Sequence, residues 1–142
     1  MRFLHTMLRV HDLDAALRFW CGGLGLVESR RSVHEVGRFT LVFLRATGDA
    51  PGGPELELTF NWDQAEPYSG GRNFGHVALA VPNIYAACAA LEAQGFAILR
   101  PPRDGRMAFV RSPDEQSVEL LQAGAALPPQ EPWSNRPNVG SW

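Results

Sequence analysis

Two stretches of similar pattern decide the fold of this chain: HTMLRVHDLDAALRFW at residues 5–20 and HVALAVPNIYAACAAL at residues 76–91. Each opens on a histidine and continues as a short apolar strand. Each then passes through a candidate helix N-cap, Asp12 or Asn83, into apolar residues at helical spacing. Three further strand patterns follow each helix pattern. The sequence therefore predicts two copies of one β-α-β-β-β unit.

The first predicted copy covers residues 1–61 and the second covers residues 74–122, with a polar, glycine-containing linker at 62–73. This pattern predicts the α+β class and a single domain over residues 1–122. The C-terminal extension 123–142 is rich in proline, which excludes a regular helix or a central strand. We nevertheless expect at least one of its two tryptophans, Trp133 and Trp142, to dock on the body or on a partner subunit.

Composition narrows the classes of protein. The chain has 142 residues with 13 Lys plus Arg and 15 Asp plus Glu, and a net charge of −2 argues against nucleic-acid binding. No apolar run approaches the length of a membrane span, and the N-terminal residues lack the pattern of a signal peptide. The two cysteines, Cys21 and Cys88, are expected to be reduced. We therefore predict a cytoplasmic protein with no membrane partner.

The candidate chemistry is repeated in the two copies. His5 and His76 each begin a first strand, whereas Glu57 and Glu119 each lie in an otherwise apolar last strand. A carboxylate in such a strand is costly to bury unless it is paired or binds a metal. Two imidazoles and two carboxylates form a ligand set suited to a divalent transition metal, with two positions left open in an octahedral shell. The four residues are the predicted metal ligands.

Three segments, HTMLRV, LELTFNW and GHVALAV, resemble glyoxalase I (lactoylglutathione lyase) in the vicinal oxygen chelate, or glyoxalase/bleomycin resistance/dioxygenase, superfamily. The resemblance covers about residues 1–122. It implies that each β-α-β-β-β module forms an open half-barrel and that a homodimer completes the metal sites. His5 and Glu57 would then share a metal ion with the partner's His76 and the partner's Glu119.

The resemblance also implies a reaction. Glyoxalase I isomerises the hemithioacetal of methylglyoxal and glutathione to S-lactoylglutathione through a metal-stabilised enediolate, which detoxifies methylglyoxal. Glu119 would be the leading base and Glu57 its counterpart on the other face of the substrate. Arg9, which shares a strand face with His5, and Asn61 would contact the γ-glutamyl end of glutathione, and Arg72 would reach across the interface. Short bacterial forms favour nickel or cobalt, with zinc as the alternative.

Other interpretations stay open at this stage. The loop PPRDGRM at residues 101–107 is shorter than in typical glyoxalase I, so the thiol is not fixed, and Arg103 and Arg106 are candidates to bind its glycine carboxylate. The alternatives are another metalloenzyme of the superfamily, such as an epimerase or a dioxygenase, or a non-catalytic protein that binds small molecules. The sequence fixes neither the native metal nor the physiological substrate.

Overall fold

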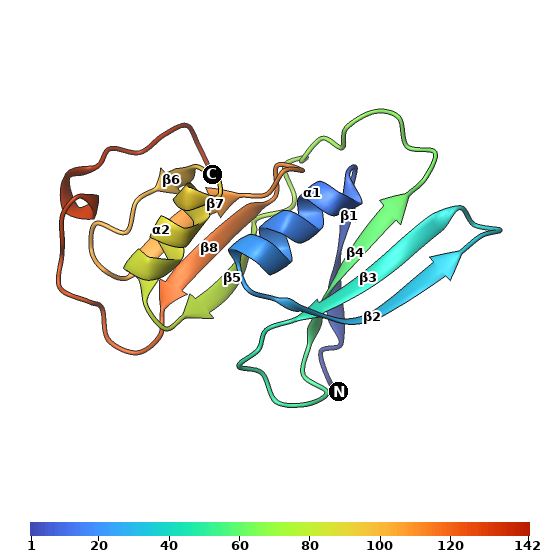
Figure 1. Cartoon of the computed structure of the whole chain (residues 1–142), viewed down its shortest axis with the longest axis horizontal. Coiled ribbons are helices and arrows are strands. Elements are labelled where there is room, and N and C mark those ends of the chain that lie inside the picture. The colour runs from blue at the N-terminus through green and yellow to red at the C-terminus, as the bar shows by residue number, and fades with distance from the viewer. The chain divides into compact units, whose positions relative to one another are not determined.

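The computed structural model describes all 142 residues, which form two compact units, residues 1–69 and residues 70–142 (Figure 1). The elements of the first unit are β1 (His5–Val10), α1 (Leu13–Leu17), the π-helical turn η1 (Arg18–Gly23), β2 (Val27–His34), β3 (Phe39–Arg45) and β4 (Glu55–Asn61). Those of the second are β5 (His76–Val81), α2 (Ile84–Ala93), β6 (Ile98–Arg100), β7 (Met107–Arg111), β8 (Ser117–Gln122) and the 3₁₀ turn η2 (Trp133–Asn135). None of the helices is both long and apolar enough to cross a bilayer.

Each unit contains one open, four-stranded mixed sheet. The strand order is β1-β4-β3-β2 in the first unit and β5-β8-β7-β6 in the second. The first and last strands of each unit pair in parallel, and the remaining neighbours are antiparallel. The predicted α+β class and the repeated half-barrel module are confirmed. The parallel pairing matters for the site, because it places each histidine strand directly beside its glutamate strand.

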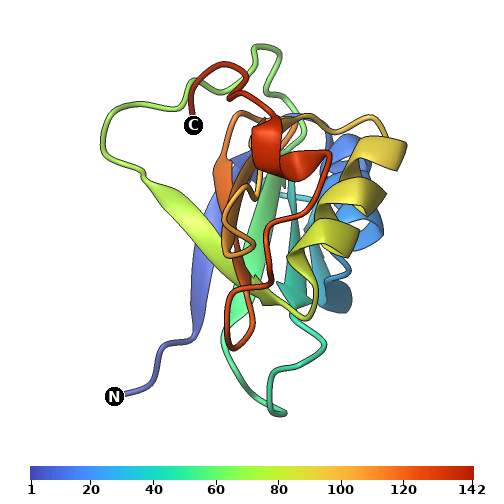
Figure 2. The same ribbon diagram turned by 90° about the vertical axis from the view of Figure 1, so that its left-hand side faces the viewer.

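In the first unit the alternation of side chains divides the sheet into a core face and an open face. Val10, Val42 and Leu58 are completely buried on the core face. Figure 2 shows α1 on one side of these strands. As predicted, Asp12 is the N-cap of α1, and its carboxylate accepts a hydrogen bond of 2.9 Å from the backbone N–H of Ala15.

In the second unit α2 packs on one side of β6, β7 and β8 (Figure 2). Asn83 is its N-cap, as predicted, and accepts a 3.0 Å hydrogen bond from the N–H of Ala86. The Gln122 side chain, at the end of β8, accepts a 2.9 Å bond from the Ile84 N–H and donates one of 2.9 Å to the Pro82 carbonyl. These contacts join the start of α2 to the last strand, so helix and sheet are tied at two backbone positions.

The C-terminal segment runs beside α2 in both views (Figures 1 and 2). The Trp133 side chain is 5% exposed, which confirms that at least one tryptophan of this segment docks on the body. Arg136 donates to both carboxylate oxygens of Glu92 on α2, at 3.0 and 2.6 Å, and the Tyr85 hydroxyl donates to the Pro128 carbonyl at 3.0 Å. The segment is therefore part of the packed structure of the second unit.

One glycine controls how this segment meets the β6–β7 loop. Gly105 has a φ of 65°, and a Cβ atom there would lie 1.9 Å from the Leu127 carbonyl oxygen. The Leu127 N–H also donates a 3.0 Å hydrogen bond to the Gly105 carbonyl. Gly124 has a similar φ of 78° but no atom within 4 Å of such a Cβ, which makes it a matched control.

We expect Gly105→Ala to lower the free energy of unfolding by at least about 2 kcal/mol, because backbone must move to relieve the clash. Gly124→Ala should cost only about 1 kcal/mol, the strain of a left-handed alanine. Urea unfolding followed by tryptophan fluorescence measures both values. Equal losses in the two variants would show that the contact between Gly105 and Leu127 does not constrain the fold.

Candidate metal and substrate site

Two histidine–glutamate pairs of matching geometry lie on the open faces of the two sheets. His5 Nε2 is 3.1 Å from Glu57 Oε2, and His76 Nε2 is 3.1 Å from Glu119 Oε2. The histidine side chains are 41% and 43% exposed, and the glutamate side chains 12% and 16%. Each unit thus presents a half-exposed imidazole against a largely shielded carboxylate.

Strand register explains the first pair. Glu57 lies opposite Met7 in the parallel β1–β4 ladder, and His5, two residues before Met7, points to the same face. The residues on either side of Glu57, Leu56 and Leu58, are buried on the core face. The apolar neighbours therefore hold the strand against the core, and this leaves the carboxylate directed at the imidazole.

The second pair follows the same rule. Ala78 lies opposite Glu119 in the β5–β8 ladder, and His76 is two residues before Ala78. Val118 and Leu120, which flank Glu119, are completely buried. Since both units place histidine and glutamate at the same offset in the same kind of ladder, the equal distances follow from the shared topology.

An aromatic ring supports each pair. Phe43 lies opposite Glu57 in the β3–β4 ladder, and Phe109 lies opposite Glu119 in the β7–β8 ladder. The ring planes of His5 and Phe43 are 83° apart with centroids at 5.8 Å, and those of His76 and Phe109 are 86° apart at 5.5 Å. These phenylalanines were not singled out in the sequence, because the partner of each glutamate depends on hairpin register. Once the hairpin register is known, the residue opposite each glutamate identifies these phenylalanines.

The pairs have the separation expected of neighbouring metal ligands. Nitrogen and oxygen ligands about 2.0–2.2 Å from a divalent metal lie about 3 Å apart when the angle between them is near 90°. No third His, Cys, Asp or Glu joins either pair to make a group able to hold a metal ion. Each pair therefore fits half of the predicted ligand set, and a complete set needs a second pair.

The predicted substrate-binding residues lie in different settings. Arg9 extends from β1 on the same face as His5, and Asn61 at the end of β4 donates a 2.8 Å hydrogen bond to the Tyr68 hydroxyl. Arg72 is exposed in the segment before β5, four residues from His76. The fold thus places Arg9 and Asn61 on the same sheet as the first pair, and Arg72 in the same unit as the second.

The short loop uses one of its two arginines internally. Arg103 donates to the Arg136 carbonyl at 2.9 Å and to Asn138 Oδ1 at 2.8 Å, so it holds the C-terminal segment. Arg106 is exposed. Both arginines are candidates for binding a carboxylate of the thiol. Arg103 instead binds the C-terminal segment, so Arg106 is the better candidate of the two.

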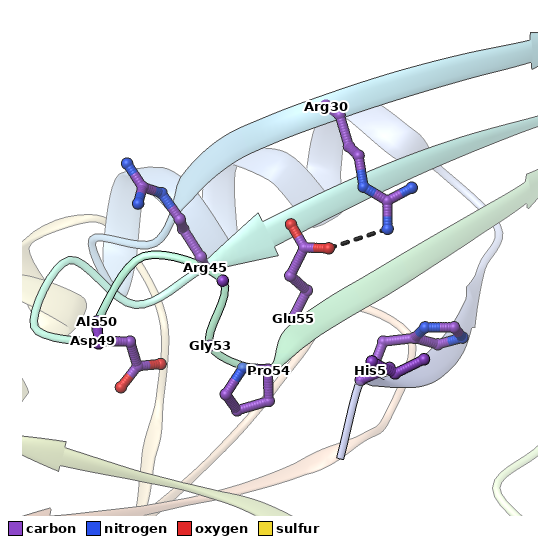
Figure 3. A pocket seen from close by; sticks show the side chains of 10 residues that line it. His5, Arg30, Arg45, Asp49, Ala50, Gly53, Pro54 and Glu55 are labelled. Atoms are coloured by element: carbon purple, nitrogen blue, oxygen red, sulfur yellow. Dashed lines mark hydrogen bonds and ion pairs between the residues drawn. The ribbon is translucent and has the colours of Figure 1, made fainter. Parts of the chain in front are cut away.

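A cavity of about 360 Å³ opens beside His5 (Figure 3). Arg30 and Arg45 line it, and the loop before β4 closes one side. Arg30 pairs with Glu55 at 2.9 Å, and its guanidinium lies 3.2 Å from the centroid of the Phe43 ring. A hydrogen bond from Ser29, followed by Arg30, lowers the pKa of the Glu55 carboxyl. The sequence showed this loop only as a turn, so the cavity was not predicted.

Comparison with known proteins identifies the family. The model of the "Glyoxalase/Bleomycin resistance protein/Dioxygenase superfamily" matches residues 2–133. The chain therefore belongs to this superfamily. The lactoylglutathione lyase of Neisseria meningitidis is 42% identical over 127 residues, which cover 86% of this chain and 91% of that protein. A probable lactoylglutathione lyase of Vibrio parahaemolyticus is 40% identical over 126 residues, covering 85% and 90%. These relatives confirm the resemblance to glyoxalase I and the predicted enzyme class.

Solved structures agree with this placement. The trypanothione-dependent glyoxalase I of Leishmania major is 34% identical with a TM-score of 0.79, covering 86% of each chain. The glyoxalase I of Zea mays is 29% identical with a TM-score of 0.76, covering 87% of this chain but 45% of that one. An antibiotic-binding protein from Streptomyces, at 19% identity and a TM-score of 0.61, shares the fold.

Neither cysteine is suited to act as a nucleophile. Burial, followed by the charge of Glu92, raises the pKa of the Cys88 thiol to about 12. Burial and then Glu28 raise the pKa of Cys21, which is less buried. A raised pKa lowers the fraction of reactive thiolate near neutral pH. The imidazole and carboxylate groups of the two His–Glu pairs therefore remain the candidate functional groups of the site.

A thiol-specific aromatic disulfide reagent tests this difference. In the native protein at pH 8 we expect Cys21 to react first and Cys88 only over the time of unfolding, and raising the pH should speed the Cys21 reaction through its thiolate fraction. Cys88→Ala should remove the slow phase alone, and urea should make the two thiols react together. Rapid labelling of Cys88 in the native protein would contradict its burial.

Proposed function

We propose that the chain catalyses the metal-dependent isomerisation of the hemithioacetal of methylglyoxal and glutathione to S-lactoylglutathione. The observation that carries this proposal is the pair of matched His–Glu contacts, each at 3.1 Å. Relatives of about 40% identity named lactoylglutathione lyase support the same reaction. This activity removes methylglyoxal, and the reduced thiol that it requires agrees with the predicted cytoplasmic location.

The ligand set would be completed by a homodimer. His5 and Glu57 of one chain would bind the same ion as the partner's His76 and the partner's Glu119. Two observations support this arrangement: neither pair has a third ligand in its own unit, and the chain covers only 45% of the maize enzyme, which has room for two such lengths in one polypeptide. All four ligands lie within the proposed domain 1–122, and residues 123–142 extend it.

The four residues would hold a divalent metal ion, which when bound would supply Lewis-acid stabilisation of negative charge on the substrate. Nickel or cobalt is the proposed metal, with zinc as the alternative. Imidazole nitrogens suit all three ions, and two carboxylates balance their charge. His5, Glu57, the partner's His76 and the partner's Glu119 would hold the ion and leave it accessible to the substrate.

The proton transfer is assigned to the glutamates. Glu119 would take the proton from C1, so that the C–H electron pair forms the C1–C2 double bond and the C2=O π pair moves onto O2. The same carboxyl group would then return the proton to C2 as the hydroxyl proton passes from O1 to O2, which leaves a thioester carbonyl at C1. Glu57 would serve the opposite face of the substrate. Because the Glu119 side chain is 16% exposed, few water molecules compete for the proton between these steps.

The remaining contacts would hold the thiol. Arg9 can pair with a carboxylate of the γ-glutamyl end through its guanidinium, and Asn61 can donate to the same group. Arg72 would reach the substrate across the subunit interface. The Leishmania relative is described as trypanothione-dependent, so the thiol differs between similar folds and has to be tested directly.

The first experiment is to strip the protein of metal and reload it separately with nickel, cobalt and zinc. We expect no formation of S-lactoylglutathione from methylglyoxal plus glutathione in the stripped protein, and recovery with one ion bound per site. Trypanothione replaces glutathione in a parallel assay. If protein shown to bind a metal isomerises neither hemithioacetal, the proposed reaction is wrong.

Mixing two inactive variants tests the shared site. Glu57→Gln and Glu119→Gln should each lose turnover by a factor of about 10³ or more. In a heterodimer of the two variants one site carries both substitutions and the other carries neither. Random exchange of subunits should therefore restore about a quarter of the wild-type activity. Glu28→Gln, an exposed β2 residue paired with Arg31, is the control that should keep full activity. No recovery would mean that both pairs come from one chain.

A further inference from the structure

The segment Arg136–Trp142, here called the strap, is fixed to the outer strands of the second unit. The Val139 N–H donates a 2.8 Å hydrogen bond to the Leu99 carbonyl on β6, and Arg111 on β7 donates one of 2.7 Å to the Ser141 carbonyl. Arg103 holds the start of the strap, as described above. The strap is therefore held by hydrogen bonds at its start, at the edge strand β6 and at β7.

The strap ends on the aromatic ring beside the second His–Glu pair. The Trp142 ring stacks on Phe109 with centroids 5.5 Å apart and ring planes 22° apart. Phe109 is the ring that meets the His76 imidazole edge-on and lies opposite Glu119. Phe109 is 7% exposed, but Trp142 remains 40% exposed. The exposed indole face of Trp142 is therefore an apolar surface separated from the His76–Glu119 pair only by the Phe109 ring.

The first unit covers its equivalent ring differently. There β2 has 8 residues, and it carries Arg30 across Phe43. The corresponding strand β6 places Arg100 opposite Phe109, as β2 places Arg30 opposite Phe43. The Arg100 guanidinium, however, donates to the Met107 carbonyl and to Asp104 Oδ2, and the indole of the strap stacks on Phe109 instead. The rings beside the two His–Glu pairs are therefore covered differently, Phe43 by a guanidinium and Phe109 by an indole.

We propose that Trp142 determines substrate specificity by contacting the carbonyl substituent of the hemithioacetal, and that it favours aromatic 2-oxoaldehydes over methylglyoxal. This inference rests on the proposed function. In the hemithioacetal the substituent is attached to C2, one of the two carbons that react, so it would lie near the candidate metal ligands while the thiol extends from C1. A methyl group covers little of an indole face, whereas a phenyl ring can stack on it.

The test compares hemithioacetals of glutathione with phenylglyoxal and with methylglyoxal. We expect Trp142→Ala to lower kcat/KM for phenylglyoxal about tenfold, mainly through KM, and to change the value for methylglyoxal by less than about twofold. Trp142→Phe keeps a ring and should recover most of the phenylglyoxal value. Val139→Ala, an exposed residue of the same strap, should leave the ratio of the two values unchanged.

Three results would overturn the inference. Equal losses on both substrates would place Trp142 at the common thiol part or in a purely structural role. A gain on phenylglyoxal would show that the indole narrows the site instead of binding the ring. An unchanged kcat/KM for phenylglyoxal in Trp142→Ala would show that the indole does not contact the substituent. A wild-type protein that turns over neither substrate would instead reject the proposed function itself.

Discussion

The parallel pairing of the first and last strand of each unit is the constraint on which the site depends. It brings residues about 50 positions apart in the first unit, and about 40 apart in the second, into neighbouring ladder positions. Apolar neighbours on the opposite face fix the register, because a slip of one residue would expose the core and bury the glutamate. The His–Glu distance is thus set by burial of leucine and valine, and Phe43 and Phe109 support the imidazoles from the neighbouring strand.

This dependence explains how much the sequence could predict. The order of elements, both N-caps and the two histidine and two glutamate positions follow from local patterns: the alternation of apolar residues and the residues that begin and end helices. The phenylalanines opposite the glutamates, the Arg30–Phe43 contact and the cavity beside His5 depend on register and loop conformation, which local patterns do not encode. Arg103 shows the same limit, since its partners lie more than 30 residues along the chain.

In the second unit the C-terminal segment packs where the short β6–β7 hairpin leaves part of the unit uncovered. The segment supplies contacts to α2, to the β6–β7 loop and to the edge strand β6. Trp133 and the Arg136–Glu92 pair anchor this segment to the helix, and Gly105 allows its backbone to approach closely. Regions that sequence analysis treats as an extension can therefore belong to the packed unit, and proline content alone does not show that a segment is peripheral.

The unequal surroundings of the two rings have a stereochemical consequence. Two equivalent His–Glu pairs, taken alone, would present an ion with two interchangeable sides. A guanidinium over Phe43 and an indole over Phe109 make those sides different in charge and in shape. In the proposed homodimer a planar, prochiral carbon between these two rings would have one preferred orientation, and a proton would reach it from one side only. The asymmetry of the covering residues would then be a physical basis for a product of single handedness.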